Sequence, residues 1–227
     1  QNRIIVSINW RKLPNKKQLQ EQIRLSSGDA EKTIFVSIKN SKSIRIIGGK
    51  WRRRQLRFAP TTSLRPSGDR TRERLFNWLN SEIVGAHCID LFAGSGALAL
   101  EALSRGAKSC LAIDHDPQTV EWLRYNSDQL DAHNLTLLEC DSCRLIAKPA
   151  AQPANIVFLD PPFNTYPIAE LCQNLETWQW LLPKAMIYIE SSRALTEIDT
   201  PENWTLWRRK VSGRVDIRLY TRSETKS

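Results

Sequence analysis

The sequence predicts an α/β protein whose core is a doubly wound, mainly parallel β-sheet. Over residues 65–227, short apolar runs alternate with segments of helical periodicity, which is typical of such sheets. A glycine-rich turn, Gly94-Ser95-Gly96, joins one expected strand to a helix and would bring the backbone against a nucleotide-like cofactor. With 227 residues, of which 41% are hydrophobic, the chain can form one sizeable domain and an accessory segment.

We expect three parts along the chain. Residues 1–43 are an N-terminal extension of unknown role, with short strands over residues 4–8 and 33–38. Residues 44–64 are a basic β-hairpin, and residues 65–227 are the main domain.

Positive charge is concentrated at the front of the chain. Residues 1–74 contain 19 Lys and Arg against 5 Asp and Glu, a net charge of +14, whereas residues 75–227 contain 14 against 19, a net charge of −5. This asymmetry favours a nucleic-acid partner that is held by the front of the chain over a merely solvated basic surface.

The hairpin carries the densest group of basic side chains. The segment from Lys50 to Arg54 follows two glycines and places four positive charges around Trp51. Arg and Lys neutralise phosphates, and Trp can stack on an unpaired base, although an exposed basic turn without a ligand is the alternative. A second basic group precedes the main domain and could contact backbone phosphates or the carboxylate of a cofactor. Pairing on the helix surface, for example of Asp69 with Arg72, is the alternative. The candidate RNA contacts are Arg45, Lys50, Trp51, Arg52, Arg53, Arg54, Arg65, Arg70 and Arg72.

The main domain is expected to begin with a helix capped by Asp69 that runs through Leu79. The glycine turn that follows fits two classes of cofactor. The segment from Gly94 to Ala99 matches the dinucleotide fingerprint, with Asp114 about twenty residues further on, so a nicotinamide-dependent dehydrogenase is one interpretation. Asp90, at the strand end, favours S-adenosylmethionine (SAM), because its carboxylate would repel a pyrophosphate but suits the ammonium group of a methionine.

The next two strand ends carry polar groups for the rest of such a cofactor. Asp114 ends the apolar run 109–113 and can accept hydrogen bonds from both ribose hydroxyls. Pro117 is expected to begin the following helix, which extends to Leu130. Asp141 follows the run 135–140, and its carboxylate together with the backbone N–H of Ser142 suits adenine.

Cys140 and Cys143 lack a second pair of ligands at zinc spacing, so no metal is expected.

The tetrapeptide Asp160-Pro161-Pro162-Phe163 follows the apolar strand 156–159 and predicts transfer of a methyl group to an amine. A dehydrogenase has no use for it. The Asp160 carboxylate and the Pro161 carbonyl can accept hydrogen bonds from an aromatic NH₂ group, while Pro161 and Pro162 fix the backbone. Phe163 would stack on the extruded base. A rigid turn without a ligand is the alternative.

The remaining elements complete an open sheet. A helix over residues 168–175 and a strand over residues 186–190 come first. Two strands, 205–211 and 215–220, then form a hairpin through Ser212-Gly213-Arg214.

Over residues 44–220 the chain resembles the RsmD family, bacterial enzymes that methylate a guanine N2 amine of small-subunit ribosomal RNA. Four motifs carry the resemblance: Arg45-Ile46-Ile47-Gly48-Gly49, Arg65-Pro66 with Asp69-Arg70 and Arg72-Glu73, Asp90-Leu91-Phe92-Ala93-Gly94-Ser95-Gly96 with Gly106-Ala107, and Asp160-Pro161-Pro162-Phe163. Related proteins commonly have Thr after the Arg-Pro pair where this chain has Ser67, which keeps the hydroxyl.

The resemblance implies a Rossmann-like class I SAM-dependent methyltransferase fold, with a seven-stranded, mostly parallel sheet that contains one antiparallel strand and a small basic N-terminal hairpin. It implies SAM as methyl donor and, as target, one guanine of 16S rRNA in a 30S subunit or its assembly intermediate. The expected cofactor site comprises Asp90, Phe92, Ala93, Gly94, Ser95, Gly96, Asp114, Asp141 and Ser142.

Two further interpretations stay open: a DNA amino-methyltransferase acting on adenine N6 or cytosine N4, and a ribosome-assembly protein without catalytic activity. The sequence has no run of 18 apolar residues and no signal-peptide core at residues 1–6, and its five cysteines are odd in number. We therefore expect a monomeric cytoplasmic protein with reduced thiols.

Overall fold

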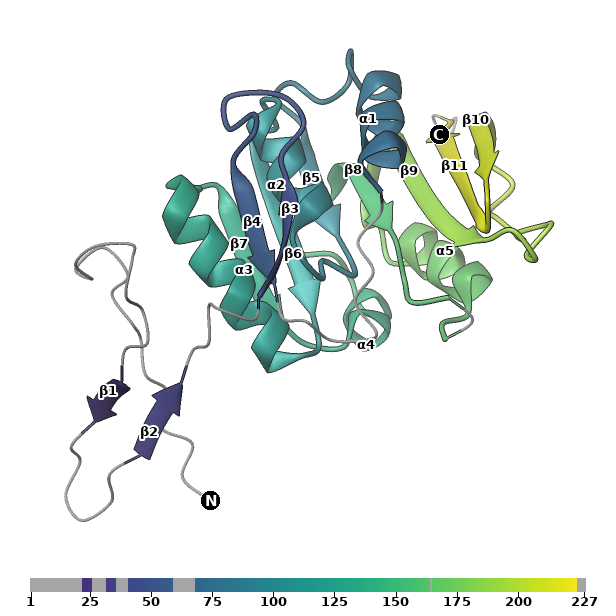
Figure 1. Ribbon diagram of the computed structural model, residues 1–227. Helices are drawn as coiled ribbons and strands as arrows, with labels where there is room; N and C mark the ends of the chain where they lie inside the picture. Colours follow the sequence, from purple (N-terminus) through teal and green to yellow (C-terminus); the bar gives the residue numbers. More distant parts are fainter. Residues whose placement is uncertain (1–21, 26–31, 36–40, 59–67, 164, 224–227) are drawn as a thin grey trace.

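The computed structural model describes residues 22–25, 32–35, 41–58, 68–163 and 165–223 (Figure 1). Its main sheet has seven strands in the order β10-β11-β9-β8-β5-β6-β7. Strands β5, β6, β7, β8 and β9 are mutually parallel, and β11 is antiparallel to both of its neighbours. The bounds are β5 His87–Asp90, β6 Ser109–Asp114, β7 Leu135–Glu139, β8 Ala154–Leu159, β9 Leu181–Ser192, β10 Trp204–Ser212 and β11 Val215–Arg222. The predicted sheet, with its single antiparallel strand and C-terminal hairpin, is confirmed.

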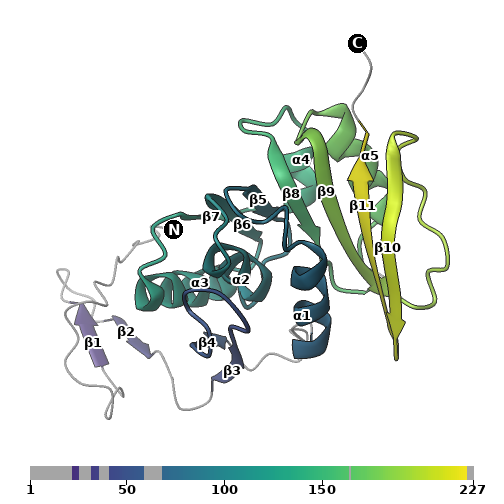
Figure 2. The same ribbon diagram turned by 90° about the horizontal axis from the view of Figure 1, so that it is seen from above.

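Helices cover both faces of this sheet (Figure 2). Their bounds are α1 Asp69–Trp78, α2 Ala97–Ser104, α3 Pro117–Leu130, α4 Ser142–Ile146 and α5 Ile168–Thr177. One core cluster joins α1, α2 and α3 to alternate strand residues such as Phe158 and Tyr188. A second cluster joins α4 and α5 to the residues between them, such as Leu159 and Ile189. This alternation is expected for strands buried on both faces.

The helix starts show one correct and one incorrect prediction. Pro117 begins α3 as predicted, and the Asp116 side chain caps the helix by accepting from the backbone N–H of Gln118. Asp69 was predicted to cap α1 but is its first helical residue, and Gly68 occupies the cap without a side-chain hydrogen bond. The Asp69 carboxylate instead pairs with Arg45 and Arg72.

Two small antiparallel sheets precede the catalytic domain. Strand β1 (Gln22–Leu25) pairs with β2 (Lys32–Phe35), which coincides with part of the strand predicted over residues 33–38. The strand predicted over residues 4–8 lies outside the described residues. Strand β3 (Lys42–Arg45) pairs with β4 (Gln55–Phe58), so the predicted basic hairpin is present.

The β3–β4 hairpin packs on the catalytic domain through both apolar and polar contacts. Ile46 and Leu56 are fully buried in a third cluster with Leu100 of α2 and Leu130 of α3. A Cβ atom at Gly49, where φ is +74°, would lie 1.8 Å from the carbonyl oxygen of Ser104. Glycine at this position therefore allows the hairpin loop to approach the C-terminal end of α2.

The Glu101 carboxylate fastens this loop. It accepts hydrogen bonds from the backbone N–H groups of Ile47 (2.7 Å) and Gly48 (2.8 Å), and it pairs with Arg105 at 2.7 Å. The Arg72 guanidinium lies 3.7 Å away, and both Glu101 and Arg72 are fully buried. The hairpin is thus held by a buried charge network that belongs to α1 and α2.

None of the helices in the described part of the chain has the length and apolar character needed to cross a bilayer.

Candidate active site

Four acidic residues follow one another along the carboxyl edge of the parallel sheet. Strands β8, β5, β6 and β7 are neighbours in that order, and Asp160, Asp90, Asp114 and Asp141 stand at or just beyond their carboxyl ends. Adjacent strands are about 4.8 Å apart, so this row extends over about 14 Å. Ligands of open α/β sheets bind at this edge. The topology therefore brings together the four predicted acids.

The glycine turn is shaped by its backbone conformation. Gly94 and Gly96 have φ values of +50° and +77°. A Cβ atom at Gly96 would lie 2.5 Å from a methyl group of Leu123, so a larger residue would push the turn away from α3. Ala93 donates its backbone N–H to the carbonyl of Ile113 at 2.9 Å, which holds the turn over β6.

Asp90 is 1% exposed and is the most perturbed acid of the site. Its Oδ2 accepts the backbone N–H of Ala99 at 3.2 Å, while its Oδ1 is buried without a hydrogen-bond partner among the described residues. The pKa of Asp90 is raised from 3.8 to about 7, mainly by burial; the backbone hydrogen bond from Ala99 opposes this rise, and the nearby Asp114 adds a smaller contribution to it. A buried acceptor without a partner fits a cationic ligand group such as the ammonium of SAM.

Replacing Asp90 by Asn should change the pH dependence of stability. Because the folded-state pKa lies above the unfolded-state value, the folded protein keeps a proton that the unfolded chain releases between pH 3.8 and about 7. The wild type should therefore lose about 1.4 kcal/mol of unfolding free energy per pH unit through this group as the pH rises across that window. Urea unfolding at pH 5 and pH 7 should show Asp90→Asn gaining stability relative to the wild type at the higher pH. A constant difference between the two proteins would contradict the assignment.

Asp114 and the glycine turn hold each other in place through a hydrogen bond. Its Oδ2 accepts the backbone N–H of Gly94 at 2.9 Å, and its Oδ1 accepts that of Asp116 at 3.0 Å. Each carboxylate oxygen can accept a further hydrogen bond, so the predicted contact with ribose hydroxyls is compatible with this geometry.

Asp141 and Ser142 form the start of α4. Asp141 is the N-cap, and its Oδ1 accepts the backbone N–H of Cys143 at 2.8 Å. The Ser142 hydroxyl donates to the carbonyl of Leu91 and ties α4 to the loop after β5. Asp141 therefore shares its carboxylate between helix capping and the predicted adenine contact, a dual use that the sequence alone did not indicate.

The Asp160-Pro161-Pro162-Phe163 loop lies beside the glycine turn. Asp90 pairs in register with Phe158, and Leu91 donates its backbone N–H to the Phe158 carbonyl. The rings of Phe92 and Tyr166 are 4.7 Å apart, which joins the two loops. Asp160 is half-buried, Pro161 is buried, and Phe163 is 43% exposed. The exposed position of the Phe163 ring is compatible with the predicted stacking on a base.

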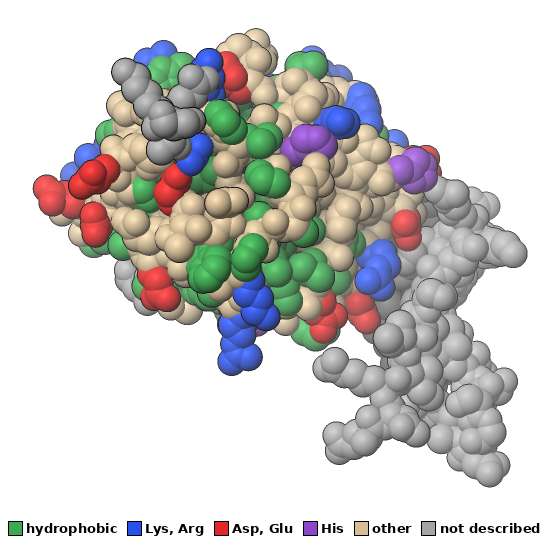
Figure 3. All heavy atoms as spheres, turned by 180° about the vertical axis from the view of Figure 1, so that it is seen from behind, with side chains coloured by type: hydrophobic (Ala, Val, Ile, Leu, Met, Phe, Trp, Pro, Cys, Tyr) green, Lys and Arg blue, Asp and Glu red, His purple; other side chains and the backbone are tan. Residues whose placement is uncertain are grey.

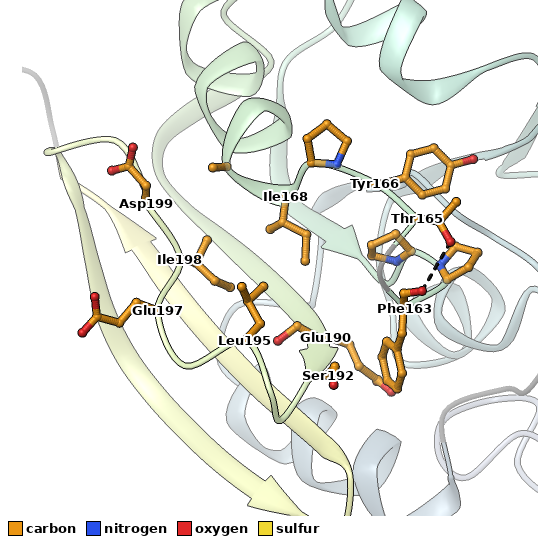
Figure 4. A pocket seen from close by; sticks show the side chains of 15 residues that line it. Phe163, Thr165, Tyr166, Ile168, Glu190, Ser192, Leu195, Glu197, Ile198 and Asp199 are labelled. Carbon is orange, nitrogen blue, oxygen red and sulfur yellow. Dashed lines mark hydrogen bonds between the residues drawn. The ribbon is translucent and has the colours of Figure 1, made fainter.

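A pocket of about 450 Å³ opens next to this loop (Figure 4). Phe163, Thr165 and Tyr166 line one side, and the segment from Leu195 to Asp199 lines the other. Thr165 donates its hydroxyl to the Phe163 carbonyl at 3.3 Å. The floor includes Glu190, Ser191 and Ser192 at the end of β9. Its size is that of a small-molecule site.

Sequence reasoning missed the residue that holds the outer wall of this pocket. Arg218, which is 2% exposed, donates to the carbonyls of Leu195 (2.6 Å) and Thr196 (3.1 Å) and pairs with the buried Asp216 at 2.7 Å. The alternation of β11 predicts that one face is buried, but which loop the guanidinium contacts depends on the tertiary fold.

The predicted RNA contacts divide into groups with different surroundings. Lys50, Arg52, Arg53 and Arg54 are exposed on the β3–β4 loop, and Arg70 is exposed on α1. Arg45 has an exposed side chain that pairs with Asp69 at 2.7 Å. Arg65 lies outside the described residues.

Trp51 and Arg72 differ from the expectation. Trp51 is half-buried against two core clusters, with the Lys50 ammonium 4.2 Å from its ring centroid. Arg72 was predicted as an RNA contact, and this is wrong: its side chain is fully buried and donates to Asp69 and to the Arg45 carbonyl. The alternative ion pair with Asp69 is the one observed, because α1 turns Arg72 toward Glu101.

The face opposite to that of Figure 1 has a different character (Figure 3). Hydrophobic side chains lie across its middle, and Lys and Arg side chains lie mainly near its edges. Within the described part of the chain, His, Cys, Asp and Glu side chains form no group that could hold a metal ion.

A family model described as "Conserved hypothetical protein 95" matches residues 44–221. Two relatives named "Ribosomal RNA small subunit methyltransferase D" are similar over most of their length. That of Escherichia coli K12 is 45% identical over 182 residues, which are 80% of this chain and 91% of that protein. That of Haemophilus influenzae is 41% identical over 194 residues, 82% of this chain and 97% of that protein.

The fold matches solved structures of the same kind. The "putative methyltransferase yhhF" of Escherichia coli superposes with a TM-score of 0.75 at 43% identity and covers 81% of this chain and all of that one. The "putative methylase HI0767" of Haemophilus influenzae gives a TM-score of 0.70 at 38% identity. Both comparisons favour methyl transfer over hydride transfer for this site.

Proposed function

We propose that this protein methylates the N2 amine of one guanine in 16S rRNA. The chain belongs to the RsmD family, whose family model is described as conserved hypothetical protein 95, and it is therefore a SAM-dependent methyltransferase. The substrate is an assembled or assembling 30S subunit, and the enzyme acts as a cytoplasmic monomer. The observation that carries this proposal is the position of the Asp160–Phe163 loop next to the glycine turn, on the adjacent strands β8 and β5.

The residues that fit SAM are those of the carboxyl edge. Asp90 would bind the ammonium group of SAM, and the Gly94–Gly96 turn would contact the methionine part beside it. Asp114 would bind the ribose, and Asp141 with Ser142 would bind the adenine. Phe92 and Ala93 form the backbone that leads into the turn. When bound, SAM would supply a methyl group on a sulfonium, so that a carbon–nitrogen bond forms as the carbon–sulfur bond breaks and the amine releases one proton.

The acceptor amine needs help because its lone pair is delocalised into the purine ring. The Asp160 carboxylate and the Pro161 carbonyl would accept hydrogen bonds from this NH₂ and direct its lone pair toward the methyl group. Pro161 and Pro162 hold that carbonyl in place before the substrate arrives. The Phe163 ring would stack on the extruded base.

Labelled SAM distinguishes the candidate targets. The protein should methylate immature small subunits and leave naked DNA unlabelled. Mass spectrometry of 16S rRNA from cells without the protein should show one missing N2-methylguanine. Labelling of DNA would instead support a function as a DNA amino-methyltransferase. Absence of methyl transfer to any RNA would support a function as an assembly protein without catalytic activity.

The basic loop of the hairpin should contribute binding rather than chemistry. Replacing Lys50, Arg52 and Arg53 together by Gln removes three exposed charges from a loop that contacts the C-terminal end of α2, whereas the glycine turn lies at the N-terminal end of that helix. We expect the KM for small subunits to rise at least about tenfold, and the salt dependence of binding to lose about one unit of slope per phosphate contact. The kcat should stay unchanged.

A charge-matched control for this variant replaces the exposed Lys108, Arg124 and Lys148 by Gln. If both triple variants raised KM equally, the effect would come from net charge and the loop would have no special role.

A further inference from the structure

The row of acids along the carboxyl edge continues for one more strand beyond Asp160. Leu159 of β8 pairs in register with Ile189 of β9, so Asp160 and Glu190 stand side by side at the next position. Neighbouring strands place such residues about 4.8 Å apart. Phe158 and Tyr188 lie in the same core cluster, so the alternation of the strands directs Asp160 and Glu190 toward that face of the sheet.

The Glu190 carboxylate is held by Tyr188. The buried Tyr188 hydroxyl donates to Glu190 Oε2 at 2.7 Å, and Glu190 is 5% exposed. Burial raises the pKa of Tyr188 well above its usual value, and the carboxylates of Glu190 and Asp160 add to this rise. The hydroxyl therefore stays protonated and keeps donating to Glu190, and a carboxylate can accept several hydrogen bonds at once.

The pocket that Glu190 lines contains a second sign of a ligand. Ser191 lines it, is 1% exposed, and its hydroxyl has no hydrogen-bond partner among the described residues. Buried polar groups are normally satisfied, so a bound molecule with a polar edge is expected to complete this one. Phe163 and Glu190 line the same pocket (Figure 4), which gives it both a stacking face and an acceptor.

The chemistry of the bases decides which molecule suits two adjacent carboxylates. In guanine, the N2 amine is flanked on the Watson–Crick edge by N1–H, which is a donor. In adenine and cytosine, the amine is flanked by a ring nitrogen with a lone pair, which is an acceptor. A carboxylate next to the group that binds the amine can accept a hydrogen bond from the N1–H of guanine, but it repels the ring-nitrogen lone pair of adenine or cytosine.

We propose that Glu190 accepts the N1–H of the target guanine while Asp160 accepts from its N2 amine, and that Glu190 thereby determines specificity for guanine. This assignment rests on the proposed function. It names the contact that separates an N2-guanine enzyme from one acting on adenine N6 or cytosine N4.

The test uses small subunits reconstituted with 16S rRNA in which the target guanine is replaced by 2-aminopurine. This base keeps the 2-amino group but presents an acceptor at N1. For the wild type we expect kcat/KM to fall about 100-fold from guanine to 2-aminopurine, the scale of an unpaired polar group in a recognition site. Glu190→Gln offers an amide N–H to that acceptor, so the ratio should shrink to less than about tenfold.

The controls separate the possible failures. Glu202→Gln, at an exposed position outside the pocket, should keep the wild-type ratio. Absence of methylation of the guanine substrate by the wild type would refute the proposed function itself. Equal rates of the wild type on both bases, or an unchanged ratio in Glu190→Gln and in the second variant Glu190→Ala, would overturn the role of Glu190 alone.

Discussion

Replacing Asp160 by Ala should abolish most methyl transfer while leaving SAM binding intact. Asp160 lies at the end of β8, beside the glycine turn but on a different strand from Asp90 and Asp114. Its removal would take away the proposed acceptor for the substrate amine, while the backbone hydrogen bonds that form the turn involve other residues. We expect single-turnover methylation of immature small subunits, at saturating SAM, to slow at least about 100-fold, the scale of a lost positioning and electrostatic contact.

Two comparisons make this result interpretable. Asp160→Asn keeps the shape of the side chain and an acceptor oxygen, so it should retain more activity than Asp160→Ala if hydrogen bonding matters besides charge. Asp128→Asn, on α3, should behave as the wild type. Calorimetry should give SAM affinities for the Asp160 variants within a few-fold of the wild type. Single-turnover rates equal to that of the wild type would remove Asp160 from the proposed mechanism.

The sheet and its row of acids were predictable because both depend on short, local sequence patterns. Each apolar run ends in a polar residue, and the rule that ligands bind at the carboxyl ends of parallel strands brings these residues together without knowledge of the packing. Asp90, Asp114 and Asp160 were found in this way. Glu190 also ends the apolar run of its predicted strand, residues 186–190, but no role was assigned to it, because only the register of β8 with β9 places it beside Asp160.

The packing of the hairpin could not be predicted from local patterns. The two glycines and the basic residues after them indicate an exposed loop, and Lys50, Arg52 and Arg53 are indeed exposed. Gly49, however, is required by a contact with Ser104, which lies 55 residues away in the sequence. Arg72 was misassigned for the same reason: a buried arginine and an exposed one look alike in a sequence until their partners are known.

The largest loss of stability is expected for Glu101→Gln. The Glu101 carboxylate is fully buried and serves two backbone N–H groups of the hairpin together with Arg105, while the buried Arg72 guanidinium lies close by. A neutral amide leaves Arg72 without this compensating charge and turns an NH₂ group toward other donors. Breaking a buried pair in this way costs about 3–5 kcal/mol. Urea unfolding at pH 7 should show this loss, whereas Glu121→Gln, at an exposed position on α3, should change the free energy of unfolding by less than about 0.5 kcal/mol.

Hydrogen exchange identifies where the Glu101→Gln variant loosens. If Glu101 fastens the hairpin, the amides of Ile47 and Gly48 should exchange much faster in the variant, while those of the central strand β5 keep their protection. The KM for small subunits should rise in the same variant, because Lys50, Arg52 and Arg53 stand on the loop that Glu101 anchors. Unchanged exchange at Ile47 and Gly48, together with an unchanged unfolding midpoint, would show that apolar packing of Ile46 and Leu56 alone holds the hairpin in place.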